Sequence, residues 1–206
     1  MTRRLLISLP AAWLVPAAQN NWDSPPFPAW DNSLADRILT GSPWAQEVRV
    51  PFRQAFAAAG RPGSIATEVH LTVRWGSALP VRQASAFALG LETRAAQKLL
   101  RTEPGEYLIE IAGLPASVVR DSKAFEKELA ATARLTGLGR AGLKAVSAAV
   151  PEFGTHVMAE VRFPRDPALR LEDKEVEFSA TALDGAMRLR ARFALKPMLY
   201  QGSLAL

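Results

Sequence analysis

Few residues in this sequence have a type and spacing that match a known chemistry. His70 and His156 are its two histidines, and together with Glu68 or Glu160 they could form a minimal metal site. Their spacing does not require a metal, because neither histidine belongs to a two-histidine helical motif. We therefore predict no metal site and no other cofactor.

A glycine-rich segment resembles a nucleotide-binding motif in its letters. Residues 137–142 are Gly-Leu-Gly-Arg-Ala-Gly, which satisfies the dinucleotide fingerprint, but that site needs a strand before the motif and a helix after it. Here the motif closely follows a predicted helix, and Pro151 would stop a helix that came after it. We interpret the segment as a loop between strands.

The possible nucleophiles and the paired charges of this sequence favour structural roles over catalytic ones. No serine lies in a Gly-x-Ser-x-Gly elbow, and the absence of cysteine excludes a thiolate nucleophile and a disulfide. Arg188, Arg190 and Arg192 could bind an anionic polymer or a lipid headgroup, but Glu175 and Glu177 compensate them, which favours a solvated face. We assign no catalytic, cofactor-binding or metal-binding residue.

The N-terminus has the pattern of a secretory signal peptide over residues 1–18. Two arginines precede an apolar stretch at 5–15, which is shorter than the ~20 residues of a membrane span. Val15 and Ala17 fit the small-x-small cleavage rule, and cleavage after Ala18 is an alternative. A buried or frayed first helix is the competing interpretation. We expect a periplasmic or secreted protein without a stable membrane span in the mature chain.

Composition limits the class of partner. The formal charge is +5, and removal of the two signal-peptide arginines leaves +3. This mild excess does not indicate a nucleic-acid partner, which would require clustered Lys and Arg. A hydrophobic fraction of 49% is typical of a globular protein.

Residues 19–45 are expected to form a Pro- and Trp-rich arm and a short helix. Apolar residues recurring at every fourth position predict the helix over about 29–40, and Gly41 could end it in the left-handed conformation. We expect Trp44 to be buried. Trp22 is expected to remain free to serve a partner.

Residues 46–206 are predicted to form a single α+β domain with a largely antiparallel sheet and short helices packed on one face or end. Alternating or β-rich patterns predict strands at 48–52, 69–75, 107–111, 157–163, 175–180 and 187–193. Residues 80–101 are expected to form one helix broken near Gly90 or two short helices, and a further helix is expected over 122–131.

The last two strands allow a prediction of register. Asp184 and Gly185 suit a type I′ turn between them. The expected apolar pairs are Val176 with Phe193, Phe178 with Ala191 and Ala180 with Leu189. The expected polar pairs are Glu177 with Arg192 and Ser179 with Arg190, which would form a cross-strand charge ladder.

Several short segments resemble a family of uncharacterised exported proteins of environmental bacteria. They are Ser-Pro-Trp-Ala at 42–45, Trp-Gly-Ser-Ala-Leu-Pro-Val-Arg-Gln-Ala at 75–84, Phe-Pro-Arg at 163–165, Glu-Asp-Lys-Glu-Val-Glu-Phe at 172–178, and 193–206, which begins Phe-Ala-Leu-Lys-Pro-Met-Leu-Tyr. The resemblance implies export and a single domain, and it supplies no catalytic residue.

Two classes of function follow. We favour a non-enzymatic protein of the cell envelope that binds or scaffolds another macromolecule, an envelope protein or a glycan, through a sheet face or the Trp-bearing arm. The alternative is a hydrolase-like or carbohydrate-binding protein whose site is assembled from scattered residues. A cleft that gathers His70, His156 and at least two carboxylates would favour the enzyme.

Overall fold

The structure is a computed structural model. It describes residues 22–58, 61–137, 142–151 and 156–206, with the backbone alone for 52–58, 61–67 and 156. The signal peptide predicted over residues 1–18 lies outside the described residues.

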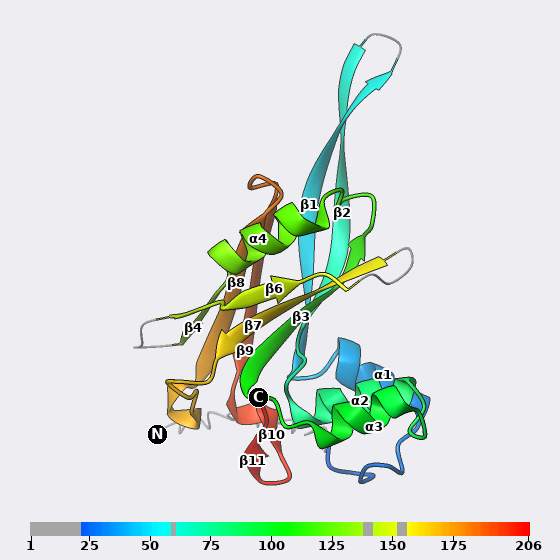
Figure 1. Cartoon of the computed structure of the whole chain (residues 1–206), viewed down its shortest axis with the longest axis vertical. Helices are drawn as coiled ribbons and strands as arrows, with labels where there is room; N and C mark the ends of the chain where they lie inside the picture. The colour runs from blue at the N-terminus through cyan, green and yellow to red at the C-terminus, as the bar shows by residue number, and fades with distance from the viewer. Residues whose placement is uncertain (1–21, 59–60, 138–141, 152–155) are drawn as a thin grey trace, which may run out of the picture.

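Two antiparallel sheets account for most of the strands (Figure 1). The five-stranded sheet contains, in spatial order, β1 (Ala45–Ala58), β2 (Arg61–Trp75), β3 (Glu106–Pro115), β7 (His156–Pro164) and β6 (Ser147–Ala149). The four-stranded sheet contains β5 (Leu143–Lys144), β4 (Arg134–Gly137), β8 (Glu175–Ala182) and β9 (Met187–Ala194). The predicted α+β class with a largely antiparallel arrangement is confirmed.

The helices occupy two places around the sheets (Figure 1). They are α1 (Asn32–Thr40), α2 (Leu79–Ala88), α3 (Arg94–Arg101) and α4 (Ser122–Thr132). The first three gather at one end of the molecule, and the predicted break between α2 and α3 occurs at Gly90, whose φ is +81°. Helix α4 packs on β8 of one sheet and β6 of the other.

The chain after β9 makes a small terminal unit. A 3-10 turn over Lys196–Met198 leads into the short strands β10 (Leu199–Tyr200) and β11 (Ser203–Leu204), which pair with each other. A further 3-10 turn, Leu171–Asp173, precedes β8. Strand β9 ends at Ala194, and Pro197 lies in the 3-10 turn over Lys196–Met198.

The hydrophobic core lies between the two sheets. Phe163 on β7 meets Phe178 on β8 edge to face, with ring centroids 6.2 Å apart. Trp75 on β2 meets Phe193 on β9 at 5.8 Å, and all four side chains are fully buried. Since successive side chains of a strand point to opposite sides, alternate residues of β8 and β9 enter this core and the others face outward.

The β8–β9 hairpin has the predicted register. All five predicted pairs are present, from Val176 opposite Phe193 to Ala180 opposite Leu189. Asp184 and Gly185 have φ values of +52° and +83°, as a type I′ turn requires at both central positions. The amide of Ala186 closes the turn by donating to the main-chain oxygen of Leu183 at 2.9 Å.

The β1–β2 hairpin is much longer than its sequence suggested. Predicted strands at 48–52 and 69–75 become one ladder that runs from Ala45 opposite Arg74 out to Ala58 opposite Arg61. Strand β3 pairs with only the last four residues of β2, Thr72–Trp75. The part of the β1–β2 ladder nearer the turn therefore projects beyond the rest of the chain (Figure 1). The sequence did not predict this length because Ala, Pro and Gly, which have low β-propensity, are frequent between the two predicted strands.

The expectation for Trp22 is wrong. Its side chain is only 8% exposed and packs edge to face on Trp44 at 6.1 Å, while the guanidinium of Arg37 lies 5.8 Å from its ring centre. Trp44 is fully buried, as expected. The arm is held against the end of the chain as well, because the amide of Gln201 donates to Asp23 at 3.0 Å. Trp22 therefore fastens the arm and does not offer a free surface.

Helix α1 ends at Thr40, as expected, but it begins later than expected and Gly41 does not end it in the expected conformation. It begins at Asn32 because Asp31 caps it, with the Asp31 carboxylate accepting from the amide of Leu34 at 2.7 Å. It ends without a left-handed residue, since the φ of Gly41 is −142°.

Candidate functional site

The outward side of the four-stranded sheet carries the charge ladder that the sequence predicted. Glu177 lies between two arginines, accepting from the Nε of Arg192 at 2.8 Å and pairing with the Nε of Arg190 at 3.2 Å. The hydrogen bond with Glu177 raises the pKa of Arg192 above its ordinary value. Both arginine side chains are more than 60% exposed, so this ladder is open to solvent.

The structure adds cations that the sequence did not place on this face. Strand β4 pairs with β8 and with β5, so that one row of facing residues crosses all four strands. The row is Lys144, Arg134, Ser179 and Arg190. Lys144 and Arg134 are directly opposite each other, an arrangement of like charges that is unfavourable without a compensating anion.

We call this surface the cationic face. It comprises Arg134, Lys144, Arg188, Arg190 and Arg192 with the carboxylates Glu175 and Glu177. Five cations and two anions leave a formal excess of +3. Glu177 contacts two of the arginines, whereas Arg188 makes no ion pair with the residues that the structure describes. The compensation expected from the sequence is therefore partial.

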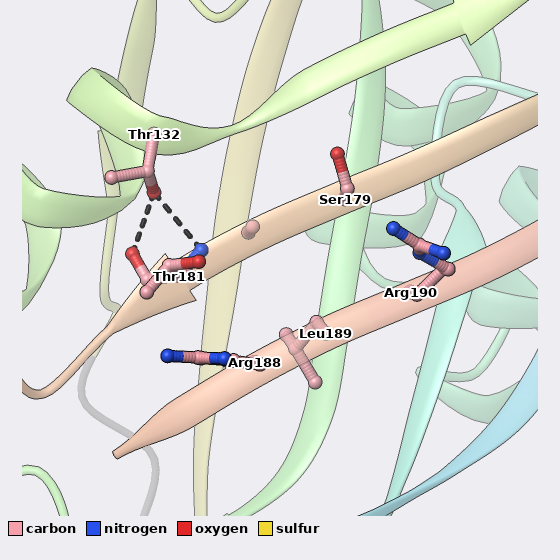
Figure 2. A pocket seen from close by; sticks show the side chains of 7 residues that line it. Thr132, Ser179, Thr181, Arg188, Leu189 and Arg190 are labelled. Carbon is pink, nitrogen blue, oxygen red and sulfur yellow. Dashed lines mark hydrogen bonds between the residues drawn. The ribbon is translucent and has the colours of Figure 1, made fainter. Parts of the chain in front are cut away.

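A hollow of about 390 Å³ opens at one end of the cationic face. It is lined by Thr132, Ser179, Ala180, Thr181, Arg188, Leu189 and Arg190. Figure 2 shows the two arginines on β9, the Ser179 and Thr181 side chains on β8, and Thr132 of α4 beside the end of β8. Hydroxyl groups and guanidinium groups thus lie around the same opening.

Thr132 fixes the wall of this hollow. Strand β4 pairs with β8 only as far as Ser179, so β4 leaves the main chain of Thr181 without a partner on that side. The Thr132 hydroxyl donates to the main-chain oxygen of Thr181 at 2.6 Å and accepts from its amide at 3.1 Å (Figure 2). The end of α4 is therefore tied to β8 by a contact between residues far apart in sequence.

The histidines occupy the other sheet. The Nδ1 of His70 lies 3.0 Å from Glu47, its Nε2 lies 3.5 Å from Glu68, and all three side chains are more than half exposed. The hydrogen bond with His70 holds the pKa of Glu47 below its ordinary value. His156 lies on β7 opposite Pro115 of β3, and its side chain is outside the description. Within the described ranges, no group of three or more His, Cys, Asp or Glu could hold a metal ion.

The flanks of the glycine-rich segment are antiparallel strands. Strand β4 ends at Gly137, β5 begins at Leu143, and Leu135 pairs with Leu143. The fingerprint arrangement needs a helix after its strand, whereas here a second strand follows. Residues 138–141 themselves lie outside the described residues.

Comparisons with known proteins add no assignment: no family model, no curated protein and no solved structure matches this chain. The resemblance to a family of exported bacterial proteins therefore stays a prediction. Of the helices in the described ranges, none is long and apolar enough to span a membrane.

Proposed function

We propose that this chain is an exported, non-enzymatic binding protein of the cell envelope whose cationic face binds an acidic glycan. The observation that carries the proposal is the row of Lys144, Arg134 and Arg190 across the four strands, with Arg188 next to it. An anion held over this row would relieve the repulsion between Lys144 and Arg134.

The shape and chemistry of the face favour an extended polymer over a small metabolite. Small molecules bind in clefts that bury most of their surface, whereas Arg190 and Arg192 stand on an open sheet with most of their side chains exposed. Arginine forms two parallel hydrogen bonds with a carboxylate. The side-chain hydroxyls of Ser179 and Thr181 at the hollow are suited to sugar hydroxyls.

Each contact on such a face contributes little, because exposed ion pairs are worth about 0–1 kcal/mol. Binding would therefore depend on several cations at once and weaken as salt screens them. Residues 1–18 support the exported location.

The test is binding to polygalacturonate, a linear acidic polysaccharide, with dextran as the neutral comparison. We expect the double variant Arg188→Ala, Arg190→Ala to lose at least tenfold in affinity. The matched control is Arg94→Ala, Lys98→Ala, which removes the same formal charge from exposed positions of α3 and should bind as the wild-type chain does.

Three results would overturn the proposal. They are no binding of the wild-type chain to polygalacturonate at low salt, equal losses in the two double variants, and binding to polyglutamate alone. The export component has its own test, because the full chain expressed in a bacterium should appear in the periplasm or medium with a new N-terminus after Ala17 or Ala18. An uncleaved chain in the cytoplasm would contradict it.

A further inference from the structure

Strand β2 has a long unpaired side in the part of the β1–β2 hairpin that projects from the two sheets (Figure 1). Residues 61–69 of β2 pair with β1 along their whole length. Strand β3 pairs with β2 only at Thr72–Trp75. Among the described residues, no other strand pairs with β2. We call the side of residues 61–69 that faces away from β1 the open edge.

Gly113 marks the inner end of the open edge. Its φ is +91°, a conformation that favours glycine, and it lies where the pairing of β3 shifts register between Ile111 and Leu114. A Cβ added at Gly113 would lie 3.1 Å from the main-chain oxygen of His70. Strand β3 therefore covers this side of β2 up to His70, and the edge is open beyond it.

The ladder shows which main-chain groups face the open edge. The amide of Trp75 donates to the main-chain oxygen of Trp44 at 2.9 Å, on the side of β1. Main-chain groups of successive residues alternate between the two sides of a strand, and the β1–β2 register is continuous. Odd-numbered residues of β2 therefore bond to β1, and even-numbered residues face away from it. The open edge presents the amides and oxygens of Ser64, Ala66 and Glu68 and the oxygen of Pro62, which has no amide hydrogen.

The other edge of the hairpin, on β1, is less suited to pairing. By the same alternation, Pro51 faces outward from β1, and an edge proline hinders the addition of another strand. Residues 54–58 of β1 are Gln-Ala-Phe-Ala-Ala. The open edge belongs instead to a segment with Ile65, Thr67 and Val69, whose branched residue types have high β-propensity.

The length of the open edge matches a second copy of itself. Two such edges can pair antiparallel about a two-fold axis, which is the commonest symmetry of protein dimers. Ile65 is the central residue of 61–69. An axis at Ile65 places Arg61 of each copy opposite Val69 of the other. Each hairpin then ends just before His70 of the other copy, where β3 closes the edge.

This register also satisfies the free main-chain groups. It places Ser64 opposite Ala66 of the second copy, and facing residues of this kind exchange two hydrogen bonds. It places Pro62 opposite Glu68, so that the Glu68 amide can donate to the Pro62 oxygen. An axis moved toward the base brings the second hairpin against β3 and, at Glu68, sets two carboxylates opposite each other, which is unfavourable.

We propose that this protein forms a two-fold dimer in which the open edges of two copies pair antiparallel about Ile65. The two hairpins then form one four-stranded sheet, with the rest of each chain at opposite ends of it. The contact is smaller than the ~1,600 Å² of a standard protein interface, so the dimer is weak and reversible. It does not involve the cationic face.

The first experiment measures self-association by sedimentation velocity over a range of protein concentrations. We expect the wild-type dimer fraction to rise with concentration. Ala66→Pro removes an amide from the open edge but none from the β1 ladder, and should weaken self-association at least tenfold. Ala55→Pro is the control, because it removes an outward amide of β1, opposite Ser64, and should dimerise as the wild-type chain does. The Arg188→Ala, Arg190→Ala variant should also dimerise normally.

The second experiment tests the register with single cysteines, since the chain has none. Ile65→Cys faces itself across the axis in a pair without hydrogen bonds, where Cα atoms lie about 4.5 Å apart, within the range of a disulfide. We expect mild oxidation to give a disulfide-linked dimer. Gln54→Cys is the control, because Gln54 lies opposite Ile65 on β1. Three strand spacings would separate its two copies by about 14 Å.

Four results would overturn the proposal. They are a wild-type chain that stays monomeric up to about 1 mM, an Ala66→Pro chain that dimerises as the wild-type chain does, an Ile65→Cys chain that forms no disulfide, and equal cross-linking of the Ile65→Cys and Gln54→Cys chains. The cysteine test does not use the proline variant. It therefore decides the outcome if Ala66→Pro does not fold.

Discussion

Gly76, the residue after β2, offers a sharp test of how one ion pair is packed. A Cβ added at Gly76 would lie 2.6 Å from Oε1 of Glu110 and 2.9 Å from its Cγ. Glu110 cannot move away freely, because its carboxylate accepts from the Nε of Arg74. The two side chains are only 12% and 15% exposed. The substitution Gly76→Ala should therefore displace Glu110 from Arg74.

The size of the effect follows from two opposing contributions. A hydrogen bond to a charged group contributes about 1.5–3 kcal/mol. Replacing glycine by alanine removes freedom from the unfolded chain, which favours the folded state by about 0.4–1 kcal/mol. The net expectation is a loss of about 1–2 kcal/mol in the free energy of unfolding, or about 2–8 °C in Tm for a chain of this length.

The assay is urea unfolding of a double-mutant cycle. Gly76→Ala is measured in the wild-type chain and in the Glu110→Ala chain, where the obstructing side chain is absent. In the second background the substitution should cost nothing or be slightly stabilising. Gly105→Ala is the control, because a Cβ at Gly105 meets no atom within 4 Å. Equal destabilisation by Gly76→Ala in both backgrounds would refute the reasoning.

Three further outcomes are expected. Phe178→Ala should lower the free energy of unfolding, measured in urea, by about 3–5 kcal/mol, because it leaves a cavity at a fully buried site between the sheets. The control is Leu89→Ala, at a position that is 52% exposed, which should change the free energy of unfolding by under about 0.5 kcal/mol. Asp121→Ala removes the cap of α4 and should cost about 1 kcal/mol, measured by thermal unfolding; no change would mean that the cap is unimportant. The hydrogen bond from Lys123 holds the folded-state pKa of Glu126 below the ordinary 4.5. The ionised Glu126 therefore stabilises the folded chain above pH 4.5, and this stabilisation is lost as the pH falls through the folded-state pKa. Glu126→Gln should therefore flatten the decline of Tm below about pH 4.5, and an unchanged profile would contradict this.

The β8–β9 hairpin could be predicted from sequence because its information is local. Asp184 and Gly185 specify a turn type, and alternation in the flanking residues specifies which side is buried. These two signals agree on a single register, and a shift by one residue would bring the charged residues into the core. The structure has that register.

Other features depend on contacts between distant segments. The burial of Trp22 requires Trp44 and the terminal unit around Gln201, which lie far away in the sequence. The cation row requires β4 to pair with β8, a contact of Arg134 with Ser179. Residues 134–137 are too short a segment for periodicity to mark as a strand. The missed parts of the candidate site are therefore those assembled by tertiary contacts.

The projecting β1–β2 ladder has a consequence for hydrogen exchange. Among the described residues, 52–58 and 61–67 pair only with each other, and β3 joins β2 only from Thr72 onward. A two-stranded hairpin alone is marginally stable in water, so this part can separate from its tip inward while the core between the sheets stays intact. Its amides should exchange through local opening, many orders of magnitude faster than those of Val73 or Ile109, whose protection reports global unfolding.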